Sequence, residues 1–128
     1  MYKRFEDLKV WQTGREFENR IYETSKQFPK EELYILTSQI RRAAISITAN
    51  IAEGHGRYHF RENVQFCRTS RGSVNEVLDH LYTALNEGYI KQEEFDDLYG
   101  KGREVERLLN GYIGYLDKQL KEKKSTTR

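Results

Sequence analysis

The sequence predicts an all-α protein, folded as an antiparallel up-down four-helix bundle. Apolar residues recur at spacings of three and four along most of the chain, and no segment alternates apolar and polar residues as a half-buried strand does. The connections between the periodic segments are short. The 128 residues, 37% of them hydrophobic, suffice for one domain, which we assign to residues 1–120, and residues 121–128 are expected to form a disordered basic tail.

The first helix is expected from about Phe5 to Phe28. Pro29 stops it, because proline lacks the amide hydrogen and restricts the residue before it. The acids of the following PKEE segment then suit the first turn of the second helix, since the helix dipole favours negative charge there. The apolar stripe of this second helix begins at Leu33 and ends near Gly54.

The third stripe runs from Phe60 to Leu85, and the NEGY segment that follows supplies a glycine for the helix C-cap. A fourth stripe of strict three-four spacing runs from Phe95 to Leu116. The fourth helix contains Gly100, Gly102, Gly111 and Gly114. Because each costs about 1 kcal/mol relative to alanine, either a neighbour packs closely on them or the helix is kinked or shorter.

The second helix carries ten uncharged residues in a row, from Ala43 to Ala52. Ile45 and Ala49 fall outside its main apolar stripe, so more than one face of this helix is expected to be buried. Either the helix lies unusually deep in the bundle, or its second face packs on another subunit. We favour a subunit contact, because each helix of so small a bundle has a solvent side.

No catalytic, cofactor-binding or metal-binding residues are predicted. The EGHGR segment closes a helix instead of following a strand, so its glycines favour capping, and YGKGRE lacks the phosphate-loop frame. His55 and His59 are four residues apart, but Gly54 and Gly56 interrupt the helix between them. The acids of residues 93–97 fit the start of a helix. We therefore predict a non-enzymatic protein.

The overall composition predicts a cytoplasmic protein without a membrane segment. No window approaches the apolar length of a membrane span, and the N-terminus has no apolar signal region. The single cysteine, Cys67, agrees with a reducing compartment. Because the net charge is only +2, any nucleic-acid surface has to be local.

A basic segment lies between residues 54 and 75. It contains four arginines and only one acid, Glu62, with aromatic residues between them. Arginine pairs bidentately with phosphate, and aromatic rings stack on unpaired bases. Alternatively, these arginines pair with Glu53, Glu62 and Glu76 or only face solvent. The candidate nucleic-acid-binding residues, two of them in the second helix, are Arg41, Arg42, Arg57, Arg61, Arg68 and Arg71.

A structural polar network is expected between the second and third helices. Asn50 falls on the apolar stripe, where an unpaired amide costs about 1–3 kcal/mol, so it needs a partner. Ser73 and Glu76 are the nearest candidates if the two helices are antiparallel, and a neighbouring subunit is the alternative. The predicted network consists of Asn50, Glu53, Ser73 and Glu76.

Five segments, in order, resemble the four helix bundle protein family: FEDLKVWQ, IYETSKQFP, QIRRAAISITANIAEGHGR, RGSVNE and NEGYI. It is also called the intervening-sequence protein family, because some members are encoded within insertions in bacterial large-subunit ribosomal RNA genes. The resemblance spans Phe5 to Leu116 and implies a ring-shaped homopentamer of up-down bundles without catalytic residues. The chain departs from the family pattern at Ser70, where alanine is expected, and at Lys91, where a capping serine or threonine is expected.

The chain is more distantly similar to the accessory variability proteins of diversity-generating retroelements, which are pentamers that bind nucleic acid and a reverse transcriptase. We therefore predict a homo-oligomer, with a pentamer favoured, that binds ribosomal or otherwise structured RNA through the arginines. The alternative is a scaffold that recruits a partner protein, such as a reverse transcriptase, without binding nucleic acid.

Overall fold

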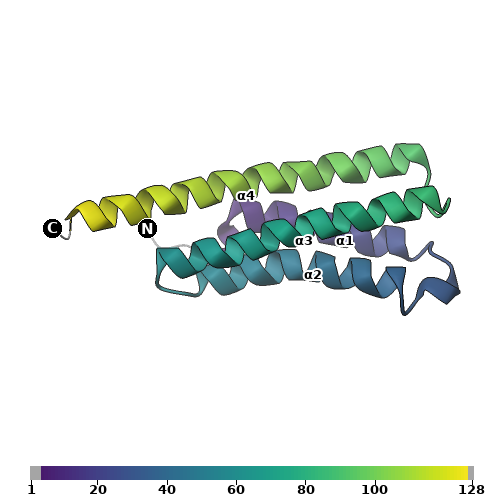
Figure 1. The fold of residues 1–128 in the computed structure, drawn as a ribbon, viewed down its shortest axis with the longest axis horizontal. Coiled ribbons are helices and arrows are strands. Elements are labelled where there is room, and N and C mark those ends of the chain that lie inside the picture. Colours follow the sequence, from purple (N-terminus) through teal and green to yellow (C-terminus); the bar gives the residue numbers. More distant parts are fainter. Residues whose placement is uncertain (1–3, 127–128) are drawn as a thin grey trace.

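The computed structural model describes residues 4–126 and shows the predicted all-α bundle. Its helices are α1 (Lys9–Ser25), α2 (Leu36–His55), α3 (Phe60–Asn86) and α4 (Gln92–Thr126), with single-turn 3-10 helices η1 (Phe5–Asp7) and η2 (Lys30–Glu32). Successive helices run side by side in opposite directions (Figure 1). Because α1 also contacts α4, the four helices close around one core.

The second helix starts later than the sequence predicts. The acids after Pro29 form the separate turn η2, and α2 begins only at Leu36, the first residue of this segment to enter the core. The Glu32 carboxylate accepts a hydrogen bond from the Leu36 amide at 3.3 Å. The acid therefore caps the start of α2 from outside the helix instead of forming its first turn.

The two turns at opposite ends of α3 use glycine differently. At the α3–α4 turn, Gly88 has a φ of +77°, and the amides of Gly88 and Tyr89 bond back to the carbonyls of Leu85 and Ala84. This Schellman arrangement confirms the predicted C-cap glycine. At the α2–α3 turn no residue has positive φ, and Gly54 lies inside the last turn of α2.

The two glycines of the EGHGR segment have different roles. Gly56 is the C-cap of α2, as predicted, whereas Gly54 gives α2 and α3 room to approach each other. A Cβ atom there would lie 2.8 Å from Cβ of Phe66 and 3.2 Å from the Asn63 carbonyl oxygen. Both atoms belong to the first two turns of α3, so only a residue without a side chain fits this crossing.

The core follows the predicted stripes of all four helices. Ile47, Leu81, Leu98 and Leu109 are among the fully buried side chains. Cys67 lies in the N-terminal third of α3 with no exposed surface, and desolvation raises the pKa of its thiol to about 12. The hydroxyl of Ser70, at one of the two family departures, donates to the Ile47 carbonyl at 2.8 Å. A serine is therefore accommodated between α2 and α3 with its polar group satisfied.

Helix α4 is continuous, and close packing by a neighbour explains only one of its four glycines. A Cβ on Gly102 would lie 2.7 Å from Leu78 and 3.0 Å from Phe17. The other three glycines, Gly100, Gly111 and Gly114, meet nothing within 4 Å in the described chain. The helix runs without interruption from Gln92 to Thr126, so it is not shorter than predicted, and these three glycines have open space beside them.

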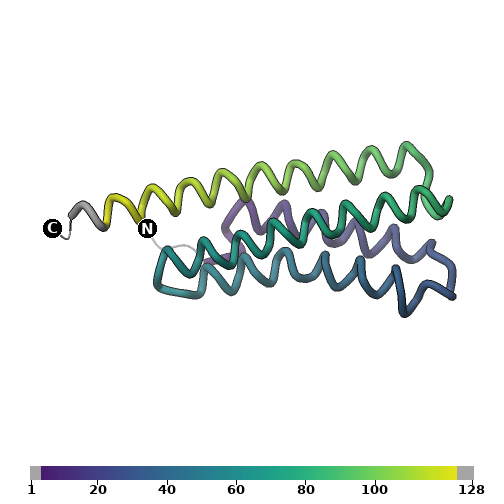
Figure 2. Tube along the Cα trace, viewed as in Figure 1, coloured from purple at the N-terminus to yellow at the C-terminus, as the bar shows by residue number. Residues whose placement is uncertain are grey.

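The last part of α4 extends beyond the α2–α3 turn (Figure 2). The helix continues through Thr126, whereas the basic composition of residues 121–128 predicts a disordered tail. Residues 127 and 128 of that tail lie outside the described residues. The division into a bundle of residues 1–120 and a tail stays a prediction.

Candidate nucleic-acid interface

Two of the six predicted arginines share the outer face of α3. Arg61 and Arg68 are both exposed, and seven residues of α-helix place them about 10 Å apart along the axis. Neither forms an ion pair or hydrogen bond with any residue of the described range 4–126. Both guanidinium groups are therefore available to an anionic partner.

Arg57 lies in the α2–α3 turn that precedes this helix, and it has acidic neighbours. Its guanidinium lies 3.2 Å from the Glu53 carboxylate and 3.7 Å from that of Glu62, and it covers the ring of Phe66 at 5.2 Å. Both ion pairs are solvent-exposed, and such pairs are worth about 0–1 kcal/mol. A phosphate could therefore displace them at little cost.

The other three arginines do not join Arg61 and Arg68. The guanidinium of Arg71 donates to Asn110 of α4 at 2.8 Å, and Arg41 donates to Ser25 of α1 at 2.8 Å and covers the Tyr22 ring. Arg41 therefore faces α1, on the side of α2 away from the arginines of α3.

The register between α2 and α3 places Arg42 away from them as well. Ser46 of α2 meets Ser73 of α3, and Arg42 precedes Ser46 by one turn while Arg68 precedes Ser73 by five residues in the opposite direction. Arg42 is exposed, but about 13 Å of helix axis separates it from Arg68. We name the set Arg57, Arg61 and Arg68 the arginine face.

Two members of the predicted polar network, Asn50 and Ser73, are joined by Ser46, which the sequence pattern does not single out. The Asn50 amide donates to the carbonyl and the hydroxyl of Ser46 at 2.7 and 2.9 Å, and the Ser46 hydroxyl lies 2.7 Å from that of Ser73. Glu53 and Glu76 are not part of it: the first pairs with Arg57, and the second lies 3.3 Å from His80. The only signal for Ser46 was its position one turn before Asn50.

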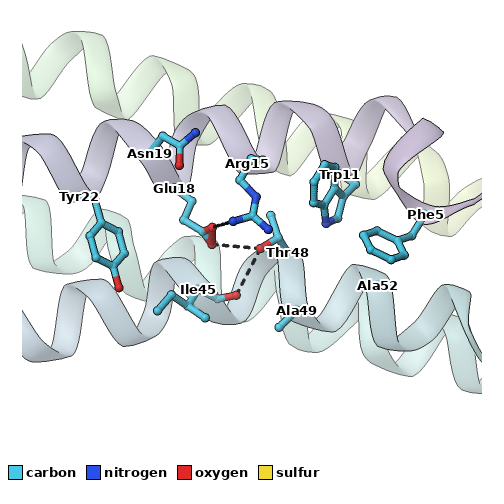
Figure 3. Close-up of a pocket in the computed structure, with 10 residues that line it drawn as sticks. All are labelled: Phe5, Trp11, Arg15, Glu18, Asn19, Tyr22, Ile45, Thr48, Ala49 and Ala52. Carbon is cyan, nitrogen blue, oxygen red and sulfur yellow. Dashed lines mark hydrogen bonds and ion pairs between the residues drawn. The ribbon is translucent and has the colours of Figure 1, made fainter.

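A second polar cluster, which the sequence analysis also missed, lies between α1 and α2. Glu18 is 3% exposed and sits between the Arg15 guanidinium at 2.9 Å and the Thr48 hydroxyl at 3.0 Å (Figure 3). These two groups satisfy a carboxylate that burial would otherwise penalise. The available signal was an acid directly beside the core position Phe17.

This cluster lies in a groove of about 530 Å³ that also exposes part of the uncharged run of α2 (Figure 3). Ile45 is 46% exposed, and Ala49 is exposed beside it. Residues from η1, α1 and α2 line the groove: Phe5, Trp11, Arg15, Glu18, Asn19, Tyr22, Ile45, Thr48, Ala49 and Ala52. Ala43, Ala44 and Thr48 are buried within the bundle, so the run has one internal face and one open face.

A family model described as 23S rRNA-intervening sequence protein matches residues 6–111, most of the chain. The chain belongs to this 23S rRNA-intervening sequence protein family. A protein of unknown function from the S23 ribosomal protein family of Bacteroides thetaiotaomicron has a similar fold, with a TM-score of 0.75 and 24% sequence identity over 81% of this chain and 97% of that chain. No curated protein sequence matches this chain.

In this family member, the acids at the start of α4 have structural partners. The Glu94 carboxylate accepts hydrogen bonds from Thr24 and Gln27 at 3.1 Å, and Asp97 pairs with Arg20. These contacts attach α4 to α1. Within residues 4–126, no three histidine, cysteine or acidic side chains are grouped to hold a metal ion, and no helix is long and apolar enough to cross a bilayer.

Proposed function

We propose that this chain is a non-enzymatic, cytoplasmic, homo-oligomeric bundle that binds RNA or another nucleic acid through the arginine face. The observation that carries the proposal is the pair Arg61 and Arg68, two exposed guanidinium groups on one helix face without an acidic partner in the described chain. Arginine is suited to phosphate because its planar fork donates two parallel hydrogen bonds. The family description refers to a sequence that intervenes in 23S rRNA and names no ligand, so the proposal depends on the arginines.

Repetition of the arginine face would compensate for its small size. Two or three arginines neutralise few phosphates, so a single chain would bind weakly at physiological salt. In an assembly, each further copy of the face binds at a raised effective concentration, which multiplies the affinity without any new contact. We therefore couple RNA binding to a homo-oligomer, with a pentamer favoured by the family resemblance.

The open side of the uncharged run supports such an assembly. Ile45 and Ala49 present apolar surface in the groove between α1 and α2, and small side chains allow another helix to approach closely. We expect light scattering to give a mass near five times 15.3 kDa for the wild type and a smaller mass for Ile45→Arg. A monomeric wild type at micromolar concentration would contradict the proposed assembly.

The RNA proposal is tested by fluorescence anisotropy of a labelled RNA stem-loop over a salt series. We expect Arg61→Ala/Arg68→Ala to weaken binding and to reduce the log-log salt slope by about one for each lost phosphate contact. The matched control is Lys30→Ala/Lys91→Ala, which removes two exposed cations at the opposite end of the bundle. Equal slopes for both variants, or no binding by the wild type at low salt, would reject the arginine face.

A second candidate, a protein-interaction scaffold, is favoured by exposed apolar residues before α2. Leu33, Tyr34 and Ile35 are 46%, 88% and 64% exposed. Three such residues in succession are typical of a surface that a partner covers. A scaffold would show no salt-dependent RNA affinity, and a reverse transcriptase is the partner that the distant resemblance suggests. Pull-down with a candidate partner, lost in Tyr34→Ser and kept in Arg61→Ala/Arg68→Ala, would support this function instead.

A further inference from the structure

A pocket of about 620 Å³ lies where α4 passes the α2–α3 turn, and we name it the turn pocket. It is separate from the groove of Figure 3, with which it shares no lining residue. Its volume falls within the range typical of small-molecule sites, about 300–1,000 Å³.

The walls of the turn pocket combine aromatic rings with basic groups. Tyr112 and Tyr115 on α4 stack with an interplanar angle of 12°, and Tyr58 on the opposite turn is 88% exposed. Arg57 and His59 also line the pocket. Aromatic faces beside cationic side chains form the usual recognition set for a nucleobase joined to a phosphate.

Polar groups able to contact the edge of a base also line this pocket. Asn63 is 6% exposed, and its amide donates to the Tyr112 hydroxyl at 3.3 Å. The Tyr112 hydroxyl is protonated at neutral pH, as any tyrosine is, and can donate to a ligand.

The electrostatic surroundings suit a phosphate at the turn. Arg57 lies 3.7 Å from Glu62, beyond direct hydrogen-bonding distance, so that edge of its guanidinium can turn to another anion. His59 precedes the first residue of α3, and its side chain does not cap the helix. The positive end of the α3 dipole adds to both side chains.

We propose that the turn pocket binds one nucleotide, with the base against Tyr58 and Tyr112 and the phosphate at Arg57 and His59. The nucleotide is either a free mononucleotide or an unpaired nucleotide of an RNA held by the arginine face, and only the second source rests on the proposed function. The pocket would then give the RNA surface a preference for an unpaired base, which phosphate contacts alone cannot provide.

The test is isothermal titration with adenosine 5′-monophosphate, with ribose 5-phosphate as the ligand that lacks a base. We expect the nucleotide to bind and ribose 5-phosphate to bind at least fivefold more weakly. Tyr58→Ala is expected to weaken nucleotide binding about fivefold or more, because it removes a stacking surface. Tyr34→Ala is the matched control, since Tyr34 has the same 88% exposure at the other end of the bundle.

Tyr112→Phe is the second variant, because it keeps the packed ring and removes only the hydroxyl. Nucleotide binding that is unchanged in both variants, or equal affinity for the nucleotide and ribose 5-phosphate, would overturn the proposal. If no mononucleotide binds, RNA affinity decides: a fivefold loss in Tyr58→Ala supports an unpaired RNA base in the pocket, and no loss overturns it.

These outcomes are separate from those of the proposed function. Nucleotide binding without any RNA binding would leave the turn pocket in place as a mononucleotide site and reject the arginine face. Salt-dependent RNA binding that responds to Arg61→Ala/Arg68→Ala but not to Tyr58→Ala would do the reverse.

Discussion

The two ends of the bundle differ in charge and in the way that their helices are joined. The end with the α2–α3 turn carries four arginines and one acid over residues 54–75, together with the turn pocket. The end with the α1–α2 and α3–α4 connections carries seven acids and one lysine over residues 76–97. Because successive helices alternate in direction, each group of charges is confined to one end (Figure 1).

The connections between helices also differ at the two ends. At the basic end, α2 and α3 pack closely because Gly54 has no side chain to keep them apart. At the acidic end, the chain turns through the positive φ of Gly88, and the Tyr89 hydroxyl donates to Glu32 at 2.7 Å. One joint depends on space and the other on backbone conformation and a hydrogen bond. Substitutions at the two ends should therefore act through different physical terms.

The largest effect is expected from Gly54→Ala at the basic end. The new methyl group would overlap Cβ of Phe66, and α3 would have to move away from α2, so we expect a loss of about 3 kcal/mol in unfolding free energy. Urea unfolding followed by circular dichroism measures it. A loss below that of Gly88→Ala would show that the crossing is looser than the distances indicate.

At the acidic end, Gly88→Ala should cost about 1 kcal/mol, because an L-residue is strained at positive φ while the site has open space around it. The same urea experiment measures this value. Gly111→Ala, at an open position inside α4, is the control and should stabilise the protein slightly. If Gly88→Ala also stabilised the protein, the left-handed conformation would not be required there.

The smallest effect is expected from Tyr89→Phe, and it disappears in alkaline solution. The hydrogen bond to Glu32, with burial, raises the pKa of Tyr89 to about 12 from its ordinary value of 10. The folded state therefore holds this proton more tightly than the unfolded state, so the stabilisation is complete below pH 10 and is lost between pH 10 and about 12. Thermal unfolding of both proteins across this range should show a steeper decline in the wild type. Parallel declines would contradict the assigned partner.

Much of the fold could be predicted because periodicity records which face of each helix is buried. The stripes predicted to end at Gly54 and Leu85 stop within one residue of the ends of α2 and α3. The start of α2 could not be predicted in this way, because acids after a proline suit a 3-10 turn as well as an α-helical one. Only the contact between Glu32 and the Leu36 amide distinguishes the two.

The candidate site was less predictable because its geometry depends on neighbouring helices. Spacing within α3 placed Arg61 and Arg68 on one face, but it could not show that Arg41 faces α1. Likewise, Asn50 was expected to need a partner, and the Ser46 hydroxyl became visible as the bridge only with the register of α2 against α3. The spacing of residues along a helix predicts which face each residue occupies. Contacts between helices depend in addition on how the helices are aligned with one another in the folded protein.

The buried thiol of α3 has a practical consequence. Cys67 is the only cysteine of the chain, it has no exposed surface, and its high pKa keeps it protonated at neutral pH. A thiol reagent can therefore react only with molecules in which this part of the bundle has opened. The rate at which the reagent labels Cys67 therefore measures how often that part of the bundle opens. The Cys67 thiol donates a hydrogen bond to Asn63, which lines the turn pocket. A ligand bound in that pocket should therefore slow the labelling of Cys67.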